Sequence, residues 1–220
     1  MRKSDVQTDT ATAVREAAER LFAERGFAAV SLREIARAAD VAVSSVIYHY
    51  DNKLTLLQAI YDLHTRPMNA RRLELLGEAQ QIAEPSARLR AILRAYLLPT
   101  FSFAANGAAG GGARFTRMRA VLSAEGDAEA RRIIAQAFDE TTRLFLDAIA
   151  DCLPGASRAA IVWRAQFLLG SLYYTLINPE RIDRLSDGAT SGSDHATAIR
   201  ELVDAAHASL SALADGRIEA

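Results

Sequence analysis

Residues 31–53 read SLREIARAADVAVSSVIYHYDNK and have the pattern of two short helices joined by a tight turn. Ser31 and Glu34 have the S-x-x-E spacing of a capping box, which marks the start of a helix. Asp40 follows the apolar stripe of that helix, where the chain must turn, and aspartate tolerates the left-handed conformation better than most residues. A second apolar stripe begins directly after the turn and predicts a second helix. The segment is therefore predicted to be a helix-turn-helix, a motif that sets its second helix into the DNA major groove.

Two flanking helices are predicted to complete a three-helix head. The first runs to about Arg25, where Gly26 ends it in the manner of a C′ glycine. The second begins near Lys53, and Asp51 and Asn52 are natural N-caps for it. The helix-turn-helix is thus enclosed by a helix on either side.

The stretch from Ala18 to Ile60 reads AERLFAERGFAAVSLREIARAADVAVSSVIYHYDNKLTLLQAI. It resembles the DNA-binding head of the tetracycline-repressor (TetR) family of transcription regulators. The matching positions include Leu21, Phe22, Gly26, Phe27, Ser31, Ile35, Ala36, Ala39, Val41, Tyr48, His49, Tyr50 and Lys53. The match covers the first quarter of the chain, and the remainder agrees with this family's ligand-binding bodies in length and helical character.

The resemblance implies that the second helix of the motif reads bases and that neighbouring side chains hold phosphates. Carried over position by position, the expected DNA-binding residues are Ser31, Arg33, Val43, Ser44, Ser45, Tyr48, His49 and Lys53. The chain departs from the family pattern at Ala42, where a capping Ser or Thr is usual, and at Val43 and Ile47, where polar side chains are usual. Because few hydrogen bonds to base edges remain, we expect readout of thymine methyl groups and DNA shape. The alternative is that Val43 and Ile47 only pack within the head.

Composition and charge limit the class of protein. The chain has 220 residues, half of them hydrophobic, which suffices for a head and a larger body. Its net charge is -1, and residues 1–66 contain nine Lys/Arg and nine Asp/Glu, so DNA affinity must come from the placement of charges on one face. The N-terminus has no apolar signal segment, and the longest apolar run is short for a membrane span. We therefore expect a cytoplasmic protein.

Almost every periodic segment has helical spacing, and strand-like alternation is missing, so the predicted fold class is all-α. We expect a helix-turn-helix DNA-binding domain over residues 1–52 and a helical ligand-binding and dimerisation domain over residues 53–220. Breaks between helices are expected at Pro67 and from Pro99 onward, and a polar linker is expected over residues 178–194.

Residues 161–177 read IVWRAQFLLGSLYYTLI and are apolar around nearly the whole helix circumference. Such a helix must be covered on every side, so we expect a second subunit to cover part of it together with the last helix, as is usual in the TetR family. The expected homodimer interface contains Trp163, Gly170, Tyr173, Leu202, Ala206 and Leu210. The alternative is that both helices belong only to the core of one chain.

The resemblance also implies a pocket for a small-molecule inducer among the middle helices. The candidate lining residues are Phe103, Phe115, Arg117, Met118, Phe138, Thr142 and Phe167. An apolar or amphipathic molecule would fit this mostly apolar set, with Thr142 or Arg117 as a polar anchor. The alternative is that these aromatic residues are ordinary core.

The sequence carries no pattern typical of an enzyme or a metal site. Its four histidines lack ligand spacing with cysteine or carboxylates, and the glycines at 110–112 lack the preceding strand and following Lys-Ser of a phosphate loop. We expect no catalytic residue, no metal and no cofactor. The predicted function is a dimeric repressor that a ligand releases from a palindromic operator. The alternatives are an all-α carrier of apolar ligands or an enzyme without a DNA role, and an interaction protein that uses the apolar helix to bind another partner.

Overall fold

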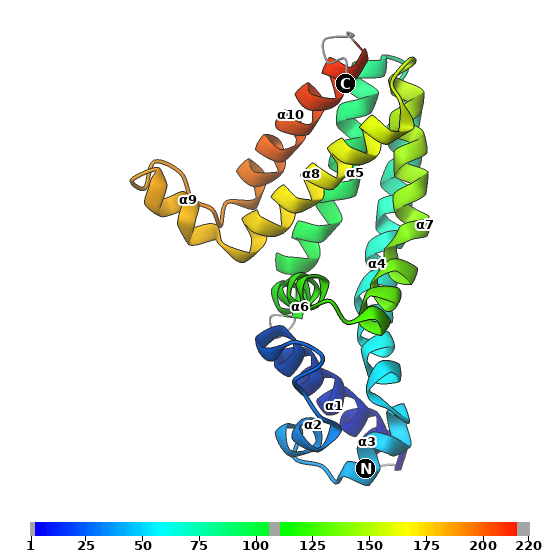
Figure 1. Ribbon diagram of the computed structural model, residues 1–220, viewed down its shortest axis with the longest axis vertical. Helices are drawn as coiled ribbons and strands as arrows, with labels where there is room; N and C mark the ends of the chain where they lie inside the picture. The colour runs from blue at the N-terminus through cyan, green and yellow to red at the C-terminus, as the bar shows by residue number, and fades with distance from the viewer. Residues whose placement is uncertain (1–2, 106–110, 215–220) are drawn as a thin grey trace. The chain divides into compact units, whose positions relative to one another are not determined.

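The computed structural model describes residues 3–105 and 111–214, with side chains over 9–101 and 114–214. Within these ranges the chain is helical and has no strand, which confirms the all-α prediction (Figure 1). The helices are α1 (Lys3–Arg25), α2 (Leu32–Ala38), α3 (Val43–Tyr50), α4 (Lys53–Gln80), α5 (Pro85–Ala105), α6 (Gly111–Glu125), α7 (Ala128–Cys152), α8 (Arg158–Ile177), α9 (Pro179–Leu185) and α10 (His195–Ala214). No helix among the described residues is long and apolar enough to cross a membrane.

The chain divides into two compact units. The first unit contains residues 3–67 and 111–138, and the second contains residues 68–105 and 139–214. The helices α1, α2, α3 and α6 therefore belong to the first unit, whereas α5, α8, α9 and α10 belong to the second. This division differs from the boundary expected after residue 52, because α6 packs along α1.

The first unit has a core to which α1, α2, α3 and α4 each contribute apolar side chains. Phe22, Ile35, Val46 and Leu57 are fully buried, one from each of these helices. Burial of a large apolar side chain stabilises a fold by about 1.5–3 kcal/mol. This shared core therefore fixes the short helices α2 and α3, which would not be stable alone.

The local signals that bound α2 and α4 are present as predicted. The Ser31 hydroxyl oxygen accepts from the Glu34 N–H at 3.3 Å, and the Glu34 carboxylate accepts from the Ser31 N–H at 2.9 Å, which completes the capping box. Asp40 has a φ of 54°, so it takes the left-handed conformation expected at the turn. The Asn52 side-chain oxygen accepts from the N–H groups at the start of α4.

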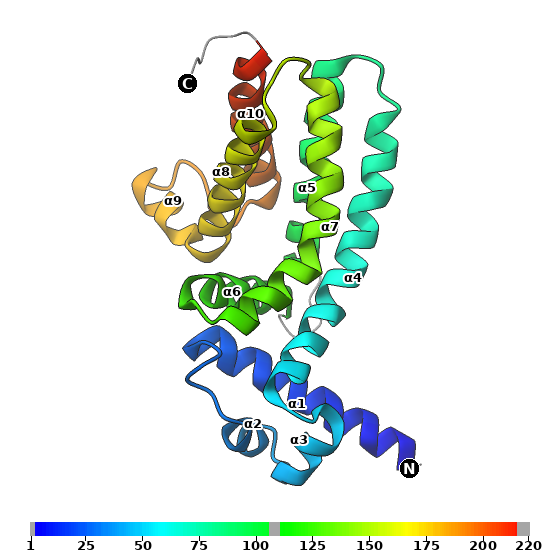
Figure 2. The same cartoon turned by 45° about the vertical axis from the view of Figure 1, so that its right-hand side comes forward.

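The second unit is built around α5, with α10 packed against both α5 and α8 (Figures 1 and 2). Leu93, Phe145, Leu172 and Leu210 are buried together in its core. Arg72 of α4 is also buried there and donates to the Tyr96 carbonyl and the Thr100 hydroxyl. The larger body therefore has its own apolar core.

Two expected helix breaks and one expected linker are wrong. Pro67 lies inside α4 and Pro99 inside α5, although an interior proline removes a backbone hydrogen bond and costs about 3 kcal/mol. The helices continue because the residues that follow the prolines, Met68 and Thr100, are buried. The short helix α9 occupies part of the expected linker, and its first position is Pro179, a favoured start residue.

Candidate nucleic-acid interface

The helix α3 presents one face to the core and the opposite face to solvent. Val46 and Tyr50 are buried, whereas Ile47 is 47% exposed and Tyr48 is 74% exposed. Ser44 is exposed, and Val43 and Ser45 are half-buried at the start of the helix. Ile47 therefore presents about half of its surface to solvent. The residues expected to meet DNA bases lie together on this helix, at or beside its exposed face.

The start of α3 has no side-chain cap, as the sequence indicated. Ala42 occupies the N-cap position, and its methyl group accepts no hydrogen bond from the first turn. The first N–H groups of a helix carry a partial positive charge and favour anions. The uncapped start of α3 is thus suited to a phosphate oxygen.

Tyr50 anchors the end of α3 to α1. Its hydroxyl donates to the carbonyl of Ala11 at 2.8 Å. Burial raises the pKa of Tyr50, and nearby Arg15 opposes this effect. The ring centroids of Tyr48 and Tyr50 lie 5.2 and 6.2 Å from that of half-buried His49. Within the Tyr-His-Tyr sequence, the Tyr48 ring is therefore exposed, whereas Tyr50 fixes α3 to α1.

Ser31 is engaged in helix capping, which occupies its hydroxyl. Besides accepting from the N–H of Glu34, this hydroxyl donates to the Glu34 carboxylate at 2.8 Å. Hydrogen bonds from Ser31, followed by one from Arg25, lower the pKa of Glu34 from 4.5 to about 2. Ser31 therefore fixes the start of α2. Arg33, in the first turn of that helix, is exposed and remains available at the surface.

Lys53 holds the loop between α1 and α2. Its ammonium donates to the carbonyls of Phe27 at 2.8 Å and Val30 at 2.9 Å, and it lies 4.1 Å from the centroid of the Phe27 ring. Burial lowers the pKa of Lys53, although the charges of Asp127 and Glu125 act in the opposite direction. The sequence led us to expect a direct phosphate contact, whereas the structure shows an ammonium that binds two backbone carbonyls.

Glu125, the last residue of α6, binds the same loop and was not among the expected site residues. Its carboxylate accepts from the N–H of Phe27 and from the N–H of Ala28, each at 2.6 Å. Gly26 has a φ of +82°, and a Cβ built at this glycine would lie 2.9 Å from the carboxyl carbon of Glu125. No local sequence signal could have found this contact, because Glu125 and Phe27 are 98 positions apart.

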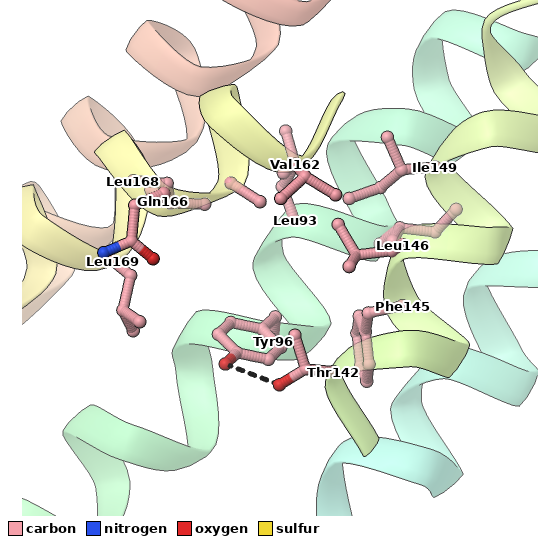
Figure 3. Close-up of a pocket in the computed structure, with 12 residues that line it drawn as sticks. Leu93, Tyr96, Thr142, Phe145, Leu146, Ile149, Val162, Gln166, Leu168 and Leu169 are labelled. Atoms are coloured by element: carbon pink, nitrogen blue, oxygen red, sulfur yellow. Dashed lines mark hydrogen bonds between the residues drawn. The ribbon is translucent and has the colours of Figure 1, made fainter. Parts of the chain in front are cut away.

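A pocket of about 110 Å³ lies in the second unit, between α5, α7 and α8 (Figure 3). The lining residues are Ile92, Leu93, Tyr96, Thr142, Phe145, Leu146, Ile149, Val162, Ala165, Gln166, Leu168 and Leu169. The hydroxyls of Tyr96 and Thr142 lie 3.5 Å apart and, with the amide of Gln166, supply the polar groups of a mostly apolar lining.

Of the seven expected pocket residues, Thr142 lines this pocket, and five others whose side chains are described lie elsewhere. Phe115, Met118 and Phe138 of the first unit are buried core, and the rings of Phe115 and Phe138 contact the Tyr61 ring. Arg117 is exposed, and Phe167 of α8 is 53% exposed. The side chain of Phe103 lies outside the described residues. The periodic pattern that suggested these residues does not distinguish a core from a pocket.

Two family models match this chain. Residues 14–60 match the model described as bacterial regulatory proteins, tetR family, and this range contains the helix-turn-helix. Residues 94–209, more than half of the chain, match the model described as tetracyclin repressor-like, C-terminal domain. The chain belongs to the TetR family. The family resemblance first noted in the head therefore extends over the body.

Individual TetR-family proteins resemble parts of the chain. The regulator TtgR of Pseudomonas putida is 32% identical over 93 residues, which is 42% of this chain and 43% of that protein. The regulator AcrR of Shigella flexneri is 34% identical over 85 residues, or 39% of each chain. The matched segments thus span less than half the length of these curated relatives. The structure of the TetR-family regulator PfmR from Thermus thermophilus shares the fold, with a TM-score of 0.56, 15% identity and coverage of 94% of this chain and 96% of that one.

The helix α8 of this TetR-family chain carries an exposed aromatic stripe. Trp163 is 62% exposed and Tyr174 is 53% exposed, and Phe167 and Gly170 lie between them at helical spacing. Contiguous exposed apolar surface of this kind marks interaction sites in soluble proteins.

Three of the residues expected in a dimer interface lie on α10. Leu202, Ala206 and Leu210 are buried inside the chain, where α10 packs against α5 and α8. Tyr173 of α8 is half-buried. The apolar face of α10 therefore contributes to the core of the second unit, and the assignment of these residues to a dimer interface stays a prediction. Among the described residues, no group of His, Cys, Asp and Glu side chains is arranged to hold a metal ion.

Proposed function

We propose that this TetR-family chain is a sequence-specific transcription regulator that acts on DNA in the cytoplasm. It represses from a palindromic operator and leaves the operator when a small apolar or amphipathic ligand binds. The observation that carries the proposal is the exposed face of α3, because Ile47 and Tyr48 are held away from the core by Val46 and Tyr50 on the opposite side. A carrier or an enzyme without a DNA role would not require an exposed face on α3.

In the proposed complex, the start of α3 enters the major groove. Val43 contacts a thymine methyl group, while Ser44 and Ser45 make hydrogen bonds that several bases accept. Tyr48, His49 and Arg33 contact phosphates, which fix the register of the protein but carry no sequence information. The uncapped first turn of α3 favours a further phosphate oxygen.

The protein acts as a homodimer in this proposal. The exposed stripe of α8 supports it, because Trp163, Phe167 and Tyr174 together form an aromatic surface of the kind enriched at interfaces. A two-fold dimer carries two recognition helices, so its operator is an inverted repeat. The half-sites are expected about one helical turn apart, roughly 34–36 Å, or a multiple of that.

The pocket in the second unit is the proposed inducer site. Its lining selects an apolar molecule, and Tyr96 and Thr142 provide a hydroxyl pair that can bind a single polar group. At about 110 Å³ it is smaller than typical ligand sites, which measure roughly 300–1,000 Å³. A ligand of ordinary size must therefore displace lining side chains, and such a displacement can accompany release from DNA.

The experiment that tests the function is a selection of bound sequences from random double-stranded DNA, followed by anisotropy measurements on the enriched site. We expect an inverted repeat that binds in the nanomolar range, roughly 10⁻⁸ M or tighter. Absence of any enriched sequence would favour the carrier interpretation. Apolar compounds that raise the melting temperature should also release the DNA, and Leu146→Trp, which fills the pocket, should abolish both effects.

A further inference from the structure

The loop of residues 26–30 is held from two sides by opposite charges. The carboxylate of Glu125 accepts from two successive backbone N–H groups, those of Phe27 and Ala28. The ammonium of Lys53 donates to two backbone carbonyls of the same loop. Hydrogen bonds with an ionised partner are about twice as strong as neutral ones, so this loop is fixed more firmly than an ordinary connection.

This loop is connected to both ends of the helix-turn-helix. Its last residue precedes Ser31, the N-cap of α2, so the loop sets where α2 begins. Lys53 is the first residue of α4 and follows the end of α3 closely, so the loop carbonyls also hold the start of the helix that comes directly after α3. A displacement of the loop would therefore affect both α2, which precedes the recognition helix α3, and the start of α4, which follows it.

We propose that Glu125 is a positioning residue for DNA binding, which fixes the loop 26–30 and, through Lys53, the base of the recognition helix. This inference rests on the proposed DNA-binding function. Glu125 lies on α6, far in sequence from the helix-turn-helix, and its carboxylate binds the loop backbone away from the residues expected to contact DNA bases. Its role is to hold the geometry in which α2 and α3 meet the duplex.

Electrostatics and positioning predict opposite results for the loss of this carboxylate. Removing a negative charge from a DNA-binding unit should leave affinity unchanged or increase it, because DNA is a polyanion. If Glu125 positions the loop, removing its charge should instead weaken binding. The sign of the change therefore separates the two effects.

The test compares Glu125→Gln and Glu125→Ala with Glu129→Gln in the full-length chain. Glu129 is an exposed carboxylate at the start of α7 that pairs with Arg132 three residues on, so it controls for the lost charge. We expect Glu125→Gln to weaken binding to the selected operator roughly tenfold, equivalent to about 1.4 kcal/mol. Glu125→Ala should weaken binding further, because alanine accepts neither N–H. Glu129→Gln should not weaken it.

Two further measurements distinguish positioning from the alternatives. The dependence of log K on log salt should keep its slope in both Glu125 variants, because no phosphate contact is removed. Hydrogen exchange of the Phe27 and Ala28 amides should accelerate in Glu125→Gln while the core amides of α1 and α4 stay protected, which identifies a loop effect and not global unfolding.

Each outcome decides a separate question. Operator affinity equal to that of Glu129→Gln would overturn the inference even if the loop amides exchange faster. Unchanged exchange at Phe27 and Ala28 would overturn it directly. If the wild-type chain binds no DNA, the proposed function fails, and the exchange measurement still reports whether Glu125 holds the loop.

Discussion

The ammonium of Lys53 lies 2.8 Å from the carbonyl oxygen of Phe27. A second hydrogen bond to the carbonyl of Val30 and a position over the Phe27 ring keep this side chain in place before any DNA arrives. Two of the three hydrogens of the ammonium are used within the protein. Its contribution to DNA binding is therefore expected to pass through the loop that it holds.

Replacing Lys53 by Met should weaken binding to all DNA sequences alike and lower the melting temperature, because methionine keeps the apolar stem but donates no hydrogen bond. We expect the slope of log K against log salt to change by much less than 1. The matched variant is Arg33→Ala, which removes an exposed cation and should reduce the slope by about 1. A slope reduced by about 1 in Lys53→Met would show that the ammonium leaves the loop for a phosphate in the complex.

The capping box should make part of the stability of the first unit depend on pH. The pKa of Glu34 is lowered from 4.5 to about 2, so its ionised form stabilises the folded state fully above pH 4.5. This contribution is lost as the pH falls from 4.5 toward 2. Glu34→Gln should therefore be less stable than wild type at pH 7, and the difference should shrink over that acidic range.

The measurement is chemical unfolding of both proteins between pH 7 and pH 2.5. Ser31→Ala serves as a comparison, because loss of the N-cap hydroxyl should cost about 1 kcal/mol at pH 7. A difference between wild type and Glu34→Gln that stays constant down to pH 2.5 would mean that the ionised carboxylate does not stabilise the start of α2.

Val43 should supply sequence information through a thymine methyl group. Val43→Ala is expected to reduce the preference for one T·A pair, by an amount at or below the low end of the roughly 1–3 kcal/mol that a good bidentate contact provides. The direct measurement uses operators in which single thymines are replaced by uracil, which removes only the methyl group. If wild type binds equally well with uracil at every half-site position, the serines or DNA shape must carry the specificity.

The aromatic stripe of α8 should hold the proposed dimer together. Trp163→Glu places a charge on that surface and should yield a monomer by size-exclusion chromatography with light scattering, with weaker operator binding. Leu144→Glu is the control, because Leu144 is also a partly exposed apolar residue but lies on α7. A dimer of unchanged stability in Trp163→Glu would exclude this stripe from the interface.

The parts of the fold that the sequence predicted depend on contacts within a few residues. Ser31 and Glu34, which form the capping box, are three positions apart. The left-handed backbone of Asp40 and the missing side-chain cap at Ala42 each depend on a single residue. Such signals act through local hydrogen bonds and backbone preferences, so a single sequence contains all the information they need. The helix-turn-helix was therefore predictable in detail.

The features that the sequence did not predict depend on distant neighbours. The apolar face of α10 was visible as a pattern, but the pattern did not reveal that Leu202 and Leu210 are buried within the chain, in the core of the second unit. Thr142 of α7 lines the pocket, whereas Phe167 of α8, which was also expected to line it, is exposed. Periodicity shows that a face is apolar, and only the tertiary packing determines what covers it.

The close approach between Gly26 and Glu125 also has a consequence for how this chain can vary. A side chain at residue 26 would be strained by a left-handed backbone, at a cost of roughly 1–2 kcal/mol, and would collide with the carboxylate. Shortening the side chain at residue 125 would relieve the collision but would also release the loop. The effect of a substitution at either position therefore depends on the residue at the other. In a library of double variants, Gly26 and Glu125 should therefore show strong epistasis, although one belongs to the head and the other to the far end of α6.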